Sequence, residues 1–193
     1  MRGMLLQAGI DLFSEKGYAS TSVREIVERA GVTKPVLYYY FKNKEGMLRD
    51  ILDCAAKMQD AILEEVLDQK GTVLERIIHL FHRIYQGVIQ NQSLFRFIHN
   101  LVFGPPQGTP SYDLKRYQRR MFEVIQTIYL EGVEKGEVRN SDPGDVAAIV
   151  MALIDFCLHL DSVNPEISDP QRPERLLHLA FQGLSERNLK SNE

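Results

Sequence analysis

The stretch from Ser22 to Lys44, SVREIVERAGVTKPVLYYYFKNK, constrains the fold more strongly than any other part of this chain. Ser22 is followed three residues later by Glu25, and this is the spacing of a capping box, in which each side chain satisfies a backbone N–H group of the first helical turn. We therefore expect a helix to begin at Val23. Gly31 then suits the left-handed backbone conformation that commonly ends a helix.

A second short helix is predicted directly after this glycine. Thr33 suits its N-cap position, and Pro35 fits its first turn. Leu37 and Phe41 lie four residues apart in this helix, so both are expected to pack inward on the first helix. The sequence thus predicts two helices joined by a glycine turn, which is the arrangement of a helix-turn-helix.

The outer face of the second helix carries Lys34, Tyr38 and Tyr39. Tyrosine hydroxyls and lysine donate to phosphate oxygens, a tyrosine ring can lie against a thymine methyl group, and a helix N-terminus attracts anions. Lys44 is a further phosphate donor, and Asn43 can cap the next helix. Helix pairs of this shape also occur in all-α proteins that do not bind DNA, so the shape alone leaves both interpretations open.

A pattern of fixed spacings extends beyond this stretch in both directions. Its members are Ala8, Leu12, Phe13, Gly17, Tyr18, Thr21, Ser22, Ile26, Ala30, Gly31, Val32, Leu37, Tyr38, Tyr40, Phe41, Lys44 and Leu48. This pattern resembles the N-terminal signature of the tetracycline-repressor (TetR) family. The resemblance implies a ligand-responsive transcriptional regulator, specifically a repressor that binds a palindromic double-stranded DNA operator as a homodimer. A small-molecule effector bound in the C-terminal domain would release it from the DNA.

The resemblance, carried over position by position, also implies which residues contact DNA. The candidates for phosphate and base-edge contacts are Thr21, Thr33, Lys34, Tyr38, Tyr39, Tyr40 and Lys44. Pro35 and Val36 occupy positions at which base-facing residues vary within the family, so we expect them to set the sequence preference. Tyr40 stands where many members of the family have histidine.

The charge of the chain is unevenly distributed. The formal net charge is -3, but residues 1–48 carry seven Lys or Arg and five Asp or Glu, so the N-terminal quarter is basic and the remainder acidic. This distribution favours a small phosphate-contacting surface over a protein that coats nucleic acid along its whole length.

Apolar residues at helical spacing predict helices along the whole chain. Besides the pair described above and a last helix with Leu176, Leu177, Ala180, Phe181 and Leu184 inward, the expected ranges are 2–16, 44–69, 73–90, 94–103, 112–134 and 145–160. No stretch indicates a strand. We expect an all-α fold with an N-terminal three-helix helix-turn-helix DNA-binding domain in residues 1–46. A larger C-terminal helical bundle, residues 47–193, is expected to bind the ligand and to dimerise.

The helix expected at 145–160 is apolar almost all round, so it has to be covered on more than one side. The resemblance implies that the last two helices pair with their copies in a second subunit. The longest uninterrupted apolar run, Val146–Ile154, is too short to span a bilayer. The N-terminus also lacks the build of a signal peptide, and Cys54 and Cys157 are expected to be reduced and buried. We therefore expect a cytoplasmic protein without a membrane partner.

Polar side chains in otherwise apolar patterns are the candidates for ligand binding. Asp155 and His159 lie four residues apart on the apolar helix, and a pair satisfied within the core or the dimer interface is the alternative to a ligand contact. The other candidates are Tyr85, Arg96, His99, Tyr117 and Tyr129.

Catalytic and metal chemistry find little support in the sequence. Glu75, His79 and His82 line one helix, but three ligands on one straight helix rarely converge on one ion, so a solvated face is the simpler interpretation. No nucleophile elbow, phosphate loop or dinucleotide fingerprint is present, and we expect no catalytic residue, metal or cofactor. Two alternatives remain: a helical protein-interaction module without DNA binding, and an enzyme acting within the bundle.

Overall fold

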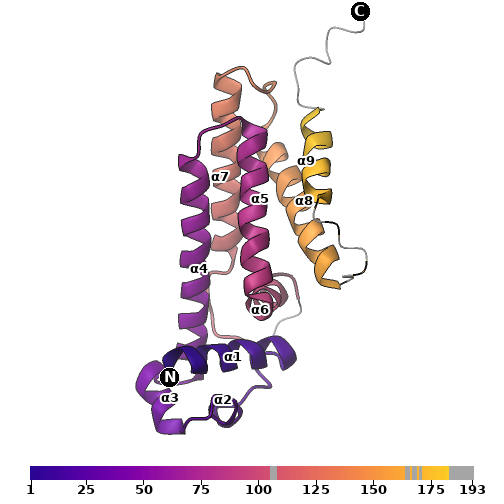
Figure 1. Ribbon diagram of the computed structural model, residues 1–193. Coiled ribbons are helices and arrows are strands. Elements are labelled where there is room, and N and C mark those ends of the chain that lie inside the picture. The colour runs from indigo at the N-terminus through magenta and orange to yellow at the C-terminus, as the bar shows by residue number, and fades with distance from the viewer. Residues whose placement is uncertain (105–107, 164–165, 167–168, 170, 183–193) are drawn as a thin grey trace, which may run out of the picture. The chain divides into compact units, whose positions relative to one another are not determined.

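The computed structural model describes residues 1–104, 108–163, 166, 169 and 171–182. Within these residues the chain forms nine α-helices and no strand, which confirms the predicted all-α class (Figure 1). The helices are α1 Arg2–Lys16, α2 Val23–Arg29, α3 Lys34–Phe41, α4 Lys44–Asp68, α5 Val73–Gln90, α6 Gln92–Phe103, α7 Lys115–Glu134, α8 Pro143–Val163 and α9 Arg172–Gln182.

Most helix bounds lie within a few residues of the predicted ones, and α1 and α5 agree with them fully. α8 begins earlier than expected, because the Asp142 carboxylate accepts hydrogen bonds from the backbone N–H groups of Gly144 at 2.8 Å and Asp145 at 3.0 Å. Leu184, expected on the inner face of the last helix, lies outside the described residues.

Two compact units make up the chain: residues 1–59 with 87–117, and residues 60–86 with 118–193. These units do not follow the expected boundary between residues 46 and 47, because the beginning of α4 and all of α6 belong with α1–α3. The assignment of DNA binding to residues 1–46, and of ligand binding and dimerisation to residues 47–193, stays a prediction about function.

The helix-turn-helix forms as its local signals predict. Ser22 and Glu25 make both hydrogen bonds of the capping box, and Gly31 has the left-handed φ of 65°. Thr33 occupies the N-cap of α3 with an extended backbone, but its hydroxyl accepts no capping hydrogen bond. The residue between α3 and α4, Lys42, also has a positive φ, at 63°.

The core of the first unit joins α1–α3 to α4 and α6. Leu37 and Phe41 of α3 are buried in it, as predicted. Phe97 of α6 is fully buried in the same core, with its ring centroid 5.4 Å from that of Phe13 in α1. The predicted boundary after residue 46 would put α6 in the C-terminal domain, so the contact of Phe97 with Phe13 was not expected from the sequence.

The second unit contains a buried arginine that holds the end of α4. Arg76 is 3% exposed, and its guanidinium donates to the carbonyl oxygens of Val66 at 3.3 Å and Leu67 at 2.9 Å. It also pairs with Glu131 of α7 at 2.5 Å. Because the last carbonyls of a helix lack intrahelical partners, this one side chain satisfies the end of α4 and links it to α7.

α8 is partly exposed despite its apolar sequence. Ile149 and Phe156 are 51% and 54% exposed, and 33% of the window Pro143–Leu160 is buried. This window has a mean hydropathy of 1.6 and meets the length and composition criteria for a membrane span, although its longest uninterrupted apolar run, Val146–Ile154, is too short for one. Core helices of soluble proteins meet the same criteria.

The two cysteines differ in their surroundings. Cys157 in α8 is buried, as expected, whereas Cys54 is exposed on α4, so the expectation of two buried thiols is wrong for Cys54.

We expect Phe97→Ala to reduce the free energy of unfolding by about 3–5 kcal/mol, because it leaves a cavity in a core that α1 and α6 share. Phe103→Ala on the same helix is the control, since its ring is 54% exposed and its loss should cost less than about 1 kcal/mol. Urea unfolding followed by circular dichroism measures both variants, and equal losses would contradict the shared core.

Candidate nucleic-acid interface

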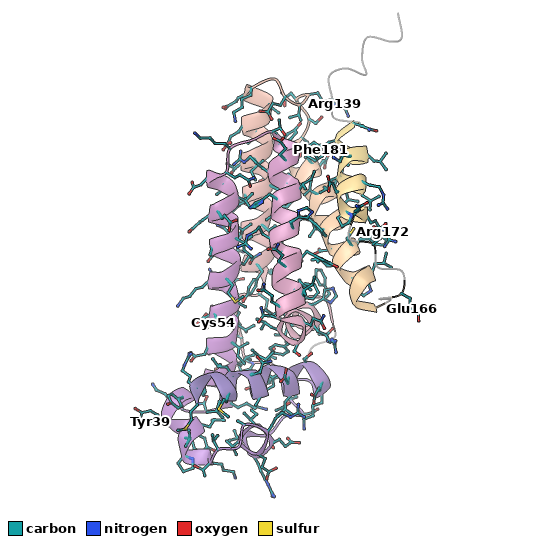
Figure 2. All side chains as sticks on the ribbon, viewed as in Figure 1. Tyr39, Cys54, Arg139, Glu166, Arg172 and Phe181 are labelled. Atoms are coloured by element: carbon teal, nitrogen blue, oxygen red, sulfur yellow. The ribbon has the colours of Figure 1, made fainter. Side chains whose placement is uncertain are left out.

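The exposed side of α3 is built from tyrosines. Tyr39 is 82% exposed, Tyr38 47% and Tyr40 38%, while Leu37 and Phe41 hold the opposite side of the helix in the core. Figure 2 shows Tyr39 projecting away from the head formed by α1–α3. The rings of Tyr39 and Tyr40 meet edge to face, with centroids 5.1 Å apart. This contact gives the most exposed ring a side-chain neighbour that restricts its orientation.

The N-terminal end of α3 is also open to a partner. Lys34 and Pro35 are exposed and Val36 is half-buried, as positions that read bases would require. The Thr33 hydroxyl makes no capping bond, and Pro35 has no N–H group to satisfy. The first turn of α3 therefore offers a free hydroxyl beside the positive end of a helix dipole.

Thr21 does not lie on this surface. Its side chain is 2% exposed, and its hydroxyl donates to the carbonyl oxygens of Gly17 at 2.8 Å and Leu12 at 3.3 Å. The hydroxyl proton of Thr21 is thus used within the head, and a contact of this residue with phosphate stays a prediction.

Lys44 is likewise turned inward. Its Nζ donates to the carbonyl oxygens of Tyr18 at 2.9 Å and Thr21 at 2.8 Å, and lies 4.1 Å from the centroid of the Tyr18 ring. Burial lowers the pKa of Lys44 from its usual value. The structure therefore shows this lysine holding α4 against the α1–α2 loop, and its contact with a phosphate stays a prediction.

Most other Lys and Arg side chains of residues 1–50 form ion pairs with carboxylates. Lys16 pairs with Glu25, and the hydrogen bonds from Lys16 and then from Ser22 lower the pKa of Glu25 to about 2. Arg29 makes two hydrogen bonds to Glu15, at 2.6 and 3.0 Å. The remaining pairs are Arg24 with Glu28, Arg49 with Glu45, and Arg2 with Asp50.

Two of the tyrosines predicted to contact a ligand serve the backbone instead. The Tyr117 hydroxyl donates to the carbonyl oxygen of Leu52 at 2.5 Å, and burial raises the pKa of Tyr117. The Tyr129 hydroxyl donates to the carbonyl oxygen of Arg139 at 2.6 Å and accepts from the N–H of Ser141 at 2.8 Å. Both hydroxyls are thus used to hold chain segments together.

The other ligand candidates are divided between the two units. In the first unit, Arg96 is exposed on α6, and the half-buried His99 ring lies between Phe95 and Phe103, with centroid distances of 5.9 and 4.9 Å. In the second unit, Tyr85 stacks on Phe81, Asp155 is half-buried and His159 is exposed.

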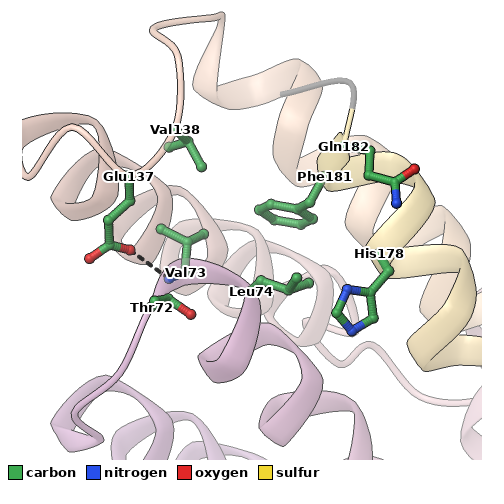
Figure 3. Close-up of a pocket in the computed structure, with 8 residues that line it drawn as sticks. All are labelled: Thr72, Val73, Leu74, Glu137, Val138, His178, Phe181 and Gln182. Carbon is green, nitrogen blue, oxygen red and sulfur yellow. Dashed lines mark hydrogen bonds between the residues drawn. The ribbon is translucent and has the colours of Figure 1, made fainter. Parts of the chain in front are cut away.

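A pocket of about 260 Å³ opens in the second unit (Figure 3). Apolar side chains from the start of α5, the α7–α8 loop and α9 form much of its wall, and the Glu137 carboxylate accepts a hydrogen bond from the Val73 N–H at 2.9 Å. The lining residues are Thr72, Val73, Leu74, Glu137, Val138, His178, Phe181 and Gln182. None of the predicted ligand residues lines this pocket.

The polar stripe of α5 is occupied by local contacts. Glu75 accepts hydrogen bonds from the N–H and hydroxyl of Thr72, and His79 Nε2 lies 2.9 Å from a carboxylate oxygen of Glu65. Across the described part of the chain, no group of three His, Cys, Asp or Glu side chains is placed to hold a metal ion.

Comparisons with known proteins place the interface in context. The sequence model described as "Bacterial regulatory proteins, tetR family" matches residues 5–51, which include most of α1, all of α2 and α3, and the beginning of α4. The HTH-type transcriptional repressor KstR2 of Mycobacterium tuberculosis (strain ATCC 25618 / H37Rv) is 26% identical over 141 residues, covering 72% of this chain and 69% of the repressor.

Two solved structures share the fold over nearly the whole chain. A gamma-butyrolactone receptor (ArpA like protein) matches with a TM-score of 0.73 at 22% identity, covering 96% of this chain and 88% of the receptor. CprB, a TetR family protein from S. coelicolor A3(2), matches with a TM-score of 0.73 at 24% identity, covering 95% and 89%.

We expect Lys44→Met to reduce the free energy of unfolding by about 1–3 kcal/mol, because two carbonyl oxygens of the α1–α2 loop lose their donor. Lys57→Met, at an exposed position of the same helix, is the control and should be nearly neutral. Thermal and urea unfolding measure both. Unchanged stability of the Lys44 variant would show that the ammonium group does not hold this loop.

Proposed function

Since the chain belongs to the TetR family of bacterial regulatory proteins, we propose that it is a homodimeric repressor that binds a palindromic operator and leaves it when a small molecule binds. Its class is that of a DNA-binding transcriptional regulator. The dimer, the palindromic operator and the release from DNA by a ligand are what we propose beyond this class.

The observation that carries the proposal is the exposed face of α3. Tyr38, Tyr39 and Tyr40 present three rings and hydroxyls to the outside of an eight-residue helix, beside the exposed Lys34 and Pro35. Such a face suits the edges of bases and the phosphates that flank them. In this proposal Thr33, Lys34 and the tyrosines contact DNA, while Pro35 and Val36 set the base preference.

The exposed apolar side chains of α8 and α9 support the proposal of a homodimer. Ile149 and Phe156 of α8 are about half exposed, and Leu179 of α9 is 62% exposed. α8 and α9 pack on each other, so these residues belong to neighbouring helices that a second copy can cover together. Two-fold symmetry then presents two α3 helices to successive major grooves, roughly 34–36 Å apart.

The effector is proposed to be a small molecule, as for the relative that is named a gamma-butyrolactone receptor. Tyr85, Arg96, His99, Asp155 and His159 remain the candidates for its contacts. α4 supplies residues to both compact units, so a ligand that favours one arrangement of this helix also biases the placement of the head.

The location proposed for such a regulator is the cytoplasm, where its DNA is.

The main alternative is a helical interaction module that keeps the head but does not bind DNA. Binding to DNA from upstream of the chain's own gene distinguishes the two hypotheses. A DNA-binding regulator should bind this duplex with an affinity that falls as the salt concentration rises, whereas an interaction module should not bind it.

Tyr39→Ala should weaken operator binding at least about tenfold, because it removes the most exposed ring and hydroxyl of the reading face. Tyr39→Phe is the matched control, since it keeps the ring and removes only the hydroxyl, and it should retain more affinity. Fluorescence anisotropy with labelled upstream duplex measures both, with circular dichroism to verify folding. Full affinity in the alanine variant would place the reading face elsewhere.

Phe156→Asp should convert a dimer into monomers, because burying an unpaired carboxylate at the centre of an apolar interface is costly. Leu130→Asp, at a 45% exposed position of α7, is the control and should leave the dimer intact. Size-exclusion chromatography with light scattering gives the mass of each. A wild-type monomer, or a dimeric Phe156 variant, would refute the proposed interface.

A further inference from the structure

The head retains few cations for a polyanionic partner. All of residues 1–50 are described, and their arginines and Lys16 are paired with carboxylates, while Lys44 is bound to backbone carbonyls. Lys34 and Lys42 form no ion pair or hydrogen bond through their side chains in this segment, and both are exposed. They stand at the two ends of α3, as its first residue and its C-cap.

Lys42 has a backbone conformation that a lysine adopts at a cost. Its φ is 63° and its ψ is -42°, and among the described residues it is the one residue other than glycine with a positive φ. Glycine meets such a requirement without steric strain. Strained positions of this kind cluster at functional sites, which makes the side chain at this position a candidate for a role in binding.

The corner between α3 and α4 holds Lys42 firmly. Its N–H donates to the Tyr38 carbonyl oxygen at 3.0 Å, and the next N–H, of Asn43, donates to the Phe41 carbonyl oxygen at 2.7 Å. The Asn43 side chain accepts from the Gly46 N–H at 2.7 Å. A Cβ atom at Gly46 would lie 2.1 Å from the Phe41 carbonyl oxygen. Any residue other than glycine at position 46 would therefore require the backbone of this corner to shift.

The positions of the two lysines fit the dimensions of DNA. Lys34, Tyr38 and Lys42 follow one another at four-residue spacing, so their Cα atoms lie along one side of α3. Eight residues of helix rise about 12 Å, and the major groove of B-DNA is about 12 Å wide. When α3 points across the groove, its two ends, each with a lysine, come near the phosphates on both sides.

We propose that Lys42 is a phosphate-contacting residue of the DNA interface, and that Lys34 and Lys42 clamp the two sugar-phosphate backbones on either side of α3. This inference rests on the proposed function. It adds a residue that lies outside those implied by the family resemblance.

The first test substitutes Lys42→Gln and compares it with Lys135→Gln, an exposed lysine of the second unit. Binding to a mixed-sequence duplex and to the upstream duplex is measured by anisotropy across a salt series. Loss of one phosphate contact should weaken binding to both duplexes by about fivefold to tenfold per head, and should reduce the salt slope by about 0.9 per head. The Lys135 variant should match the wild type.

The second variant, Lys42→Gly, separates the charge from the backbone. It relieves the positive φ, so its melting temperature should not fall below that of the wild type, yet it should lose the same affinity and salt slope as Lys42→Gln. A glycine variant that is equally stable or more stable, with unchanged affinity and slope, overturns the proposal. So does a loss confined to the upstream duplex, since phosphate contacts carry no sequence information.

Failure of this inference is distinguishable from failure of the proposed function. If the wild type binds neither duplex at low salt, DNA binding itself is refuted, and Lys42 with it. If the wild type binds with a normal salt dependence and the two Lys42 variants bind equally well, only the phosphate contact is refuted.

Discussion

The reading face depends on one constraint, which is that an eight-residue helix cannot sustain itself in water. α3 persists because Leu37 and Phe41 are buried in a core to which α1, α2, α4 and α6 contribute. Because the buried side holds α3 in place, the three tyrosines on its opposite side can stay exposed without loss of the helix. The same burial sets the orientation of the helix, so the core of the head determines where Tyr39 points as much as the sequence of α3 does.

The electrostatics of the head follow from the same need for rigidity. Five of its cations are paired with carboxylates, and Lys44 holds the α1–α2 loop by two backbone carbonyls. Exposed pairs of this kind add little stability each, but they neutralise charge that would otherwise attract any nucleic acid. In the proposed function, affinity for DNA rests on few free cations and on tyrosine contacts, which suits a protein of net charge -3 that selects one site.

Local signals explain what could be predicted from the sequence. The capping box of Ser22 and Glu25, the glycine at position 31 and the apolar spacing of α1 and α5 act within a few residues, so helix bounds and the exposure of Tyr39 were predictable. The exposure of Cys54 was predicted wrongly, and the hydrogen bonds of Lys44 were not foreseen, because the surroundings of a side chain also depend on segments far away in the sequence. Lys44 reaches carbonyls more than twenty positions away in the chain, and no spacing rule encodes that contact.

Phe97 shows the same limit at the level of domains, and it bears on how a signal could reach DNA. Its spacing with Leu94, Ile98 and Leu101 predicted a helix with an apolar side, but not that this side would join the core of the head. Since Phe97 packs on Phe13 of α1, a displacement of α6 has to be accommodated by α1, which also supports α2 and α3. Packed cores shift between discrete arrangements, so under the proposed function the packing of α6 on α1 offers a mechanical route to α3, alongside α4.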